Sequence, residues 1–413
     1  MHILWLKTEF LHPVDKGGRI RTYQMLRAIA REHRVTYLTL DDGTAAPDAE
    51  SLAREYSERV VRVPFAVAPR GSPRFFAELA GNLVSPLPYA VSRYRSARFE
   101  GELRRLAAAG DVDVVVCDFL APAVNLPPDL PVPVVLFQHN VEAEIWRRHA
   151  EVRSNPVAKR YFGIQFDRMV RFEREVCRRV AHVVAVSEAD ERHFRERYGV
   201  AEASAVATGV DTAYFAPSGA APRRPYELVF TGSMDWLPNE DGIAWFAERV
   251  LPRIRAELPE ATLTVVGRNP TPAVLALGGG GRGIEVVGRV PDVRPFVERA
   301  ALFVVPLRIG GGTRLKIYEA MAMGAPVVST TVGAEGLPLR DGEHLALADE
   351  PEAFARACVA LLRDRARAEA LGARAQGYVR AHFDWERVAA DFAATCARVA
   401  RRGGARPAPV GAA

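Results

Sequence analysis

Short apolar runs alternate with longer amphipathic stretches along most of the chain. A run such as 112–117, which is apolar except for Asp113 near its start, is typical of a strand in a parallel sheet, which is buried on both faces. Apolar residues spaced three or four apart, such as Met25, Leu26 and Ile29, predict helices. The predicted strands of the first half are 2–6, 35–40, 59–64, 112–117, 132–138 and 182–186, and the predicted helices are 20–31, 97–109, 142–179 and 188–198.

The alternation stops at 216–225, a segment rich in Pro, Gly and Ala, and then starts again. We predict a domain linker there. Repeated strand–helix units on both sides of one linker predict an α/β protein with two Rossmann-like domains that face each other across a cleft, at 1–215 and 226–384. The predicted strands of the second domain are 228–231, 262–266, 284–288, 302–306 and 327–329, with helices at 242–257, 293–299 and 315–323.

The strongest local pattern follows the strand at 302–306. Three glycines, Gly310, Gly311 and Gly312, lead to Thr313, which is placed to cap the next helix. Arg314 and Lys316 follow in the first turn, where a helix dipole disfavours cations unless an anion is bound. Glycine backbone and helix N–H groups also favour an anion, so we expect a phosphate site; a tight turn with surface cations is the alternative.

Two features of the first domain lie at the carboxyl ends of predicted strands, where α/β sheets bind ligands. Gly17 and Gly18, with Arg19 and Arg21, follow the first strand and resemble a second phosphate-approach loop, although an ordinary glycine turn fits as well. His139 follows the strand at 132–138 and is expected to point toward the cleft. A hydrogen-bonded structural histidine is the alternative.

Composition excludes several classes of protein. The chain has 413 residues, enough for two or three domains, and its net charge of +5 gives no sign of nucleic-acid binding. Four scattered cysteines exclude a disulfide scaffold and a structural zinc site, and they favour a reducing compartment. Asp111 and Asp113 form a DxD pattern, but they open a buried strand away from the cleft end, so we expect no metal. HExxH, GxSxG and Walker A patterns do not occur.

The N-terminal apolar run covers only residues 3–6 and is too short for a signal peptide, and no run is long enough to span a membrane. A cytoplasmic protein is therefore expected. One apolar, proline-interrupted stretch flanked by arginines has two interpretations: contact with a membrane surface or a lipid acceptor, or a helix pair packed on its own domain. Its apolar residues are Phe75, Phe76, Leu79, Leu83, Val84, Leu87 and Tyr89, and the arginines are Arg70, Arg74, Arg93, Arg95 and Arg98.

The segment 310–337, GGGTRLKIYEAMAMGAPVVSTTVGAEGL, resembles the donor-site segment of family 4 retaining glycosyltransferases of the GT-B fold, in a subgroup with GGGTRLK in the donor loop. Supporting segments lie in order along nearly the whole chain. They are the Gly17–Gly18 loop, QHNVEAEIW (138–146), VVAVSEAD (183–190), TGVDTAYF (208–215), FTGSMDWLPNEDGIAWF (230–246), VVGR (265–268) and GRVPDVRPF (288–296).

The resemblance implies that the second domain binds a nucleotide-diphosphate sugar and the first binds the acceptor, with a C-terminal helix and tail, 385–413, returning to the first domain. Glu319 matches the family's second motif glutamate, which holds the ribose hydroxyls, and His139 matches the histidine near the reacting centre. Gly17 and Gly18 would approach the diphosphate. The other donor-binding residues that the resemblance implies are Gly232, Ser233, Arg289, Gly310, Gly311, Gly312 and Thr313.

Two family residues are replaced in this chain. Gly311 stands where relatives have the first motif glutamate, so sugar recognition must be arranged differently. Ser233 stands at the position of the family's arginine after the first donor-domain strand, and no lysine follows it. Arg314 and Lys316 are then the natural groups to neutralise the diphosphate.

These features together predict a retaining, metal-independent glycosyltransferase without a cofactor, acting at the inner face of the cell membrane in cell-surface polysaccharide synthesis. Its predicted catalytic residues are His139, Arg314 and Lys316; its partners are a nucleotide-sugar donor and a glycan or lipid-linked acceptor. The alternatives are a GT-B-like nucleotide-sugar epimerase and a catalytically silent nucleotide-sugar-binding protein. A phosphorylase would need a pyridoxal-phosphate lysine in a far longer chain.

Overall fold

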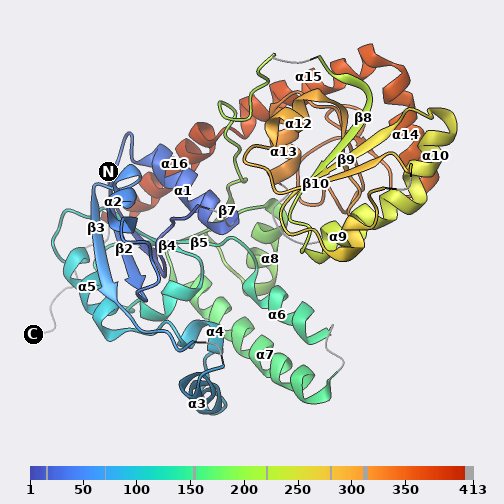
Figure 1. The fold of residues 1–413 in the computed structure, drawn as a ribbon. Coiled ribbons are helices and arrows are strands. Elements are labelled where there is room, and N and C mark those ends of the chain that lie inside the picture. The colour runs from blue at the N-terminus through green and yellow to red at the C-terminus, as the bar shows by residue number, and fades with distance from the viewer. Residues whose placement is uncertain are drawn as a thin grey trace, which may run out of the picture. The chain divides into compact units, whose positions relative to one another are not determined.

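The computed structural model describes residues 1–14, 17–69, 71–151, 155–219, 222–279, 281–309 and 315–404, which form two compact units (Figure 1). One unit contains Met1–Ala207 and the residues from Val388 onward, and the other contains Thr208–Arg387. Each unit has one parallel sheet with helices between its strands. The predicted α/β fold class is therefore confirmed.

The chain crosses from the first unit to the second at residues 207–208, before the predicted linker at 216–225. The backbone N–H of Val210 donates to the carbonyl of Phe383 at 2.7 Å. Gly209 lies so close to Trp385 that a Cβ there would come within 2.6 Å of the indole ring. These contacts hold the segment after residue 208 against the end of the second unit, so the divisions fall at 207/208 and 387/388 instead of near 215 and 385.

The sheet of the first unit has seven parallel strands in the order β3-β2-β1-β4-β5-β6-β7. Its central strands β1 and β4 are wholly buried, as the apolar runs within them predict. Strand β7 is absent from the predicted set because three residues are too short to show a period. The strands are β1 (His2–Lys7), β2 (Arg34–Asp41), β3 (Arg59–Pro64), β4 (Val114–Asp118), β5 (Val134–Phe137), β6 (His182–Ala185) and β7 (Ala203–Ala205).

The predicted helical stretch 142–179 is two helices. Asn155 accepts hydrogen bonds from the backbone N–H groups of Val157 and Ala158, and Pro156 occupies the first turn, so a new helix begins there. Ser187 caps the next helix by accepting from the Asp190 N–H. The helices are α1 (Gly17–Ile29), α2 (Ala49–Leu52), α3 (Pro73–Asn82), α4 (Tyr89–Ser92), α5 (Ala97–Ala107), α6 (Glu142–Glu151), α7 (Pro156–Arg179) and α8 (Glu188–Tyr198), with short 3₁₀ turns η1 (Ala53–Glu55) and η2 (Ala121–Asn125).

The last helix, α16 (Trp385–Gly404), contributes its residues from Val388 onward to the first unit. The ring of Phe392 lies 5.6 Å from the ring of Trp5 and 4.9 Å from that of Phe137. All three side chains are buried. The C-terminal helix therefore completes the core on one side of the first sheet.

The second unit has a six-stranded parallel sheet in the order β10-β9-β8-β11-β12-β13. The predicted strands at 262–266, 284–288 and 327–329 are found at those residues. The strands are β8 (Arg224–Thr231), β9 (Thr262–Val266), β10 (Ile284–Gly288), β11 (Ala300–Val305), β12 (Val327–Ser329) and β13 (Ala346–Leu347); the helices are α9 (Leu237–Trp245), α10 (Leu251–Glu257), α11 (Pro272–Leu275), α12 (Arg294–Arg299), α13 (Leu315–Ala322), α14 (Pro351–Arg363) and α15 (Arg365–His382).

The predicted helix at 242–257 begins earlier and is interrupted. A π-helical turn, η3 (Phe246–Val250), separates α9 from α10. Pro252 follows this turn and has no N–H to continue the α-helical ladder. The π-helical turn, which is wider than an α-helical turn, accommodates the hydrogen bond that Pro252 cannot donate.

Candidate functional site

In each sheet, the connections that follow two neighbouring central strands run toward opposite edges of the sheet. In the first unit this switch point lies between β1 and β4, and in the second between β8 and β11. Ligands of open parallel sheets bind at the carboxyl ends of the strands at such a point. Each unit therefore has one candidate site, and the two are described separately.

In the second unit, the amine of Lys316 lies at the carboxyl end of β8. It donates to Oδ1 of Asn239 at 2.9 Å and lies 4.2 Å from the centroid of the Phe230 ring. Asn239 in turn donates to the Ser233 carbonyl at 2.8 Å. Lys316 is in the first turn of α13 and Asn239 in the first turn of α9, so a cation and two helix N-termini meet at the switch point. Such a combination favours an anion.

Gly232 follows β8 and leaves the space in which Lys316 lies. A Cβ at Gly232 would come within 2.8 Å of both the Lys316 amine and the Asn239 amide nitrogen. A Cβ at the neighbouring Gly267 would meet the Gly232 carbonyl oxygen at 1.6 Å. The turns after β8 and β9 therefore pack backbone against backbone, and neither position has room for a side chain.

Ser233 belongs to a polar network at the same edge of the sheet. Its hydroxyl donates to Asp235 at 2.5 Å and accepts from Nε of Arg268 at 3.0 Å. Asn269, which has a positive φ of 54°, donates to Asp235 at 2.9 Å. Arg268, two residues after β9, thus brings a guanidinium group beside the serine that replaces the family's arginine. We did not single out Arg268 or Asn239 from the sequence.

Glu319 lies one turn after Lys316 in α13. Burial raises the pKa of its carboxyl group to about 7, against the opposing effect of the Lys316 charge. Arg289 follows β10, two strands from β8, and its side chain is exposed. Gly310, Gly311, Gly312, Thr313 and Arg314 lie outside the described residues, and their predicted roles stay predictions.

In the first unit, Lys7 and His139 are joined through Asp118, which we did not single out from the sequence. The three residues end or follow β1, β5 and β4, respectively. Oδ2 of Asp118 accepts from the Lys7 amine at 2.7 Å, and Oδ1 lies 2.7 Å from Nε2 of His139. The hydroxyl of Thr22 and the indole of Trp5 also donate to Oδ2, at 2.7 and 3.1 Å.

The protonation of this buried cluster follows from its hydrogen bonds. Burial would raise the pKa of Asp118, but the Lys7 charge and the contact with His139 outweigh it and hold the pKa below its ordinary value. Burial lowers the pKa of His139 to about 3, despite the attraction of Asp118, so the ring is neutral at pH 7. An ionised carboxylate only accepts, so the proton is on Nε2. Nδ1 is then an acceptor, and it has no partner among the described residues.

Phe119 connects this cluster to Gly18. The Phe119 ring stacks on His139 with a centroid distance of 3.7 Å, and the Lys7 amine lies 4.0 Å from its centre. Phe119 has a φ of 69°, a rare backbone conformation that is found most often at functional sites. A Cβ at Gly18 would come within 2.9 Å of the Phe119 ring. In this structure, the small size of Gly18 makes room for Phe119; Gly17, beside it, is exposed.

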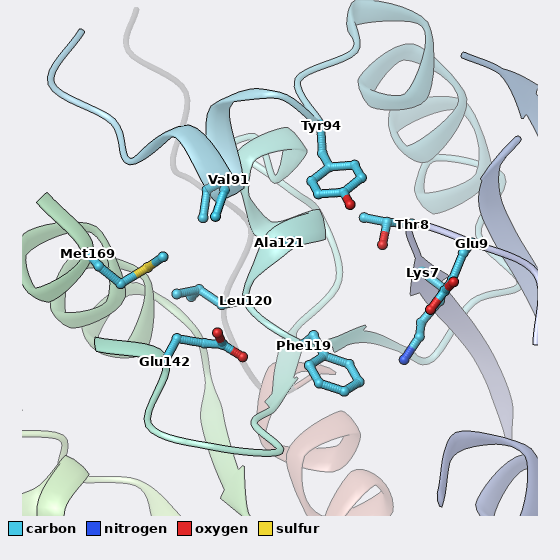
Figure 2. A pocket seen from close by; sticks show the side chains of 11 residues that line it. Lys7, Thr8, Glu9, Val91, Tyr94, Phe119, Leu120, Ala121, Glu142 and Met169 are labelled. Carbon is cyan, nitrogen blue, oxygen red and sulfur yellow. The ribbon is translucent and has the colours of Figure 1, made fainter. Parts of the chain in front are cut away.

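A pocket of about 170 Å³ opens beside Phe119, between the carboxyl ends of β1 and β4 (Figure 2). Lys7, Phe119 and Glu142 are among its lining residues. Burial raises the pKa of Glu142 to about 7, partly opposed by a hydrogen bond from Asn140. The DxD pattern is at the opposite end of the sheet, where Asp113 accepts from the backbone N–H of His2 at 2.7 Å. That aspartate therefore anchors the start of β1.

Comparison with known sequences identifies the class of protein. Residues 16–214 match the family described as Glycosyltransferase Family 4, and residues 225–364 match Glycosyl transferases group 1. The chain belongs to the group 1 glycosyltransferases. A phosphatidyl-myo-inositol mannosyltransferase of Mycobacterium leprae is 33% identical over 231 residues, which make up 53% of this chain and 60% of that relative. The matches span about half the length of most of the curated relatives, with a range from 32% to 60%.

Solved structures agree on the fold. A sucrose-phosphate synthase from Thermosynechococcus elongatus is 17% identical, with a TM-score of 0.69 over 97% of this chain and 99% of that one. HepE from Anabaena, in complex with UDP, is 15% identical, with a TM-score of 0.65 over 96% of this chain and 100% of that one. The fold is GT-B, as the sequence motifs predict.

Proposed function

We propose that this protein is a retaining glycosyltransferase that moves a sugar from a nucleotide-diphosphate sugar to a glycan or lipid-linked acceptor. The observation that carries the proposal is the position of the Lys316 amine, held by Asn239 at the N-termini of two helices at the β8/β11 switch point. The complexes of Anabaena HepE with UDP and with UDP-glucose support a nucleotide-sugar donor.

In the proposed reaction, the donor diphosphate leaves as an anion. Lys316, Arg314 and the backbone of Gly310–Thr313 stabilise its charge, so that no metal is needed. The acceptor hydroxyl forms a new bond to the anomeric carbon on the face from which the phosphate oxygen departs, and that oxygen takes the hydroxyl proton. Glu319 holds the ribose hydroxyls, and His139 lies near the reacting centre. Gly17, Gly18, Gly232, Ser233 and Arg289 complete the proposed donor-binding set.

The experiment that tests this function measures thermal stabilisation of the full chain by UDP, GDP, ADP and their common sugar esters, followed by transfer assays in EDTA. A ligand that binds only the folded state raises the melting temperature. Transfer that persists in EDTA supports the metal-free mechanism, and transfer abolished by EDTA contradicts it. An epimerised sugar without acceptor would identify the epimerase alternative, and stabilisation without any turnover would identify a silent binding protein.

The pKa of Glu319 predicts how donor binding depends on pH. A carboxylate accepts hydroxyl hydrogen bonds with both oxygens, and a group with a pKa of about 7 is ionised only above that pH. Affinity for the stabilising nucleotide is expected to rise roughly tenfold from pH 6 to pH 8. For Glu319→Gln, calorimetry should show a lower nucleotide affinity that depends less on pH. The ionisation of the nucleotide phosphate affects both proteins equally, so it cancels when their pH profiles are compared. An identical pH profile in the variant would remove Glu319 from ribose binding.

We further propose a cytoplasmic location at the inner face of the membrane, in cell-surface polysaccharide synthesis. The name of the M. leprae relative includes a phosphatidyl-inositol, which supports a lipid-linked acceptor. Within α3 and its flanks, Phe75 packs against Tyr89, whereas Phe76, Leu83 and Val84 are 60%, 57% and 91% exposed. Among the described helices, none is long and apolar enough to cross a bilayer.

The proposed membrane contact can be tested by replacing two of these exposed side chains. The double variant Leu83→Ser/Val84→Ser is expected to bind anionic phospholipid vesicles about tenfold more weakly in co-sedimentation, because two exposed apolar side chains can no longer enter the interface. Leu275→Ser, which changes a 51% exposed leucine of the second unit, is the matched control. Equal vesicle binding by all three proteins would exclude this surface.

A further inference from the structure

The pocket beside Phe119 has walls of two kinds. Tyr94 and Thr8 contribute hydroxyl groups on one side, and Glu142 contributes a carboxyl group on the other (Figure 2). The remaining surface is largely apolar. The full lining is Lys7, Thr8, Glu9, Ala90, Val91, Tyr94, Phe119, Leu120, Ala121, Glu142 and Met169.

The charges of the lining argue against an anionic ligand. Lys7 is the one cation among these lining residues, and its amine is already paired with Asp118 at 2.7 Å. Glu9 is paired with Arg19 at 2.5 Å, and Glu142 places a second carboxyl group at the pocket. Because the Lys7 amine is paired with Asp118, these lining residues offer a phosphate or carboxylate no uncommitted cation, and the ionised form of Glu142 would repel such a ligand.

The backbone at Glu142 is held by the side chain of Glu173. The backbone N–H groups of Glu142 and Ala143 donate to the buried carboxylate of Glu173 at 2.8 and 3.1 Å, which anchors the start of α6. Gln138 and Tyr198 donate to the same carboxylate at 2.9 and 2.8 Å. The Glu142 carboxyl group is therefore presented by a rigid helix end, as a preorganised binding group requires.

We propose that this pocket holds an uncharged polyhydroxylated ring of the acceptor, a hexose or a cyclitol, with Glu142 accepting hydrogen bonds from its hydroxyl groups. The ring's C–H face would lie against the apolar wall of Val91, Leu120 and Met169. Hydroxyl groups on opposite edges of the ring would face Thr8 and Tyr94 on one side and Glu142 on the other. A small pocket with an apolar wall and a few convergent polar groups suits such an amphipathic ring. This inference rests on the proposed function and names the acceptor chemistry of the first unit.

The test uses saturation-transfer NMR on the full chain with methyl α-D-mannopyranoside, methyl α-D-glucopyranoside and myo-inositol. Glucose 6-phosphate and glucuronate serve as charged probes. At least one neutral ring is expected to bind. At pH 8, where a carboxyl group with a pKa of about 7 is mainly ionised, Glu142→Gln should weaken that binding at least about tenfold, because a carboxylate–hydroxyl hydrogen bond is replaced by a neutral one. Tyr94→Phe should also weaken it while keeping the aromatic ring.

Glu144→Gln is the matched control, since Glu144 is two residues further along α6 and pairs with Arg147 at 2.7 Å outside the pocket. Tighter binding of a charged probe, no binding of any neutral ring, or unchanged binding in Glu142→Gln with an unaltered melting temperature would each overturn the inference. Nucleotide stabilisation measured on the same samples separates the two hypotheses. If nucleotides stabilise the protein and no neutral ring binds, only the acceptor pocket fails; if a neutral ring binds and no nucleotide does, the proposed donor function fails.

Discussion

Replacing Lys316 by alanine is expected to lower turnover by about 10²-fold or more, which is the usual cost of removing one preorganised group that stabilises charge in a transition state. The leaving diphosphate carries that charge in the proposed reaction. The Lys316 amine is held by Asn239 at 2.9 Å and by the Phe230 ring at 4.2 Å, so its position is already set in this structure.

A second variant tests position separately from charge. Gly232→Ala keeps the lysine but places a methyl carbon 2.8 Å from its amine, so the amine must move. Turnover should fall in this variant too, although less than in Lys316→Ala. Lys159→Ala, which removes an exposed lysine from α7 of the first unit, should retain the original rate. Steady-state rates at saturating donor and acceptor, with melting temperatures for each variant, provide the measurement. Near-normal turnover in Lys316→Ala would exclude this lysine from the mechanism.

Replacing Asp118 by asparagine is expected to lower kcat by on the order of 10²-fold, because it moves the proton of His139 from Nε2 to Nδ1. Lys7, Thr22 and Trp5 all donate to Oδ2 of Asp118. An asparagine must therefore turn its carbonyl oxygen toward these donors and its NH₂ toward His139. Nε2 of the histidine would then accept, and its proton would move to Nδ1, which could no longer accept a hydrogen bond from a substrate hydroxyl.

The tautomer provides a measurement that a merely structural effect would not change. ¹⁵N chemical shifts of His139 should report a proton on Nε2 in the original protein and on Nδ1 in Asp118→Asn. His139→Gln should lose a similar factor in kcat, and the double variant should lose little more than either alone, since both changes remove one function. Asp129→Asn, at an exposed aspartate, is the control. A reversed tautomer with full kcat would mean that Nδ1 takes no part in the reaction.

Much of the fold could be predicted because its signals are local. Strands such as 262–266 and 327–329 are short segments rich in β-branched residues, and the cap at Ser187 is set by its immediate neighbours. Predictions failed where local signals were weak. The split between α6 and α7 depends on a cap and a proline inside a stretch of uniform helical character, and β7 is too short to show periodicity.

The candidate site was less predictable. The sequence pointed to Lys316, Glu319 and Gly232 through a local turn pattern and a family resemblance, and the structure brings Lys316 and Gly232 together. It did not point to Asn239, which anchors the lysine across 77 positions of sequence. Nor did it indicate that Gly18 accommodates Phe119, since that contact depends on a backbone conformation of Phe119 that apolar residues rarely adopt.

The sequence by itself determined two parallel α/β units and membership of a glycosyltransferase family, because hydrophobic period and motif order are properties of neighbouring residues. Only the tertiary structure decided that Lys7, Asp118 and His139 form one buried cluster and that a pocket opens beside it. The order of strands in a sheet is set by how helices pack on its faces, and that order brings the carboxyl ends of β1, β4 and β5 together. Once buried side by side, these groups fix one another's charge and proton positions, which no single residue's identity could reveal.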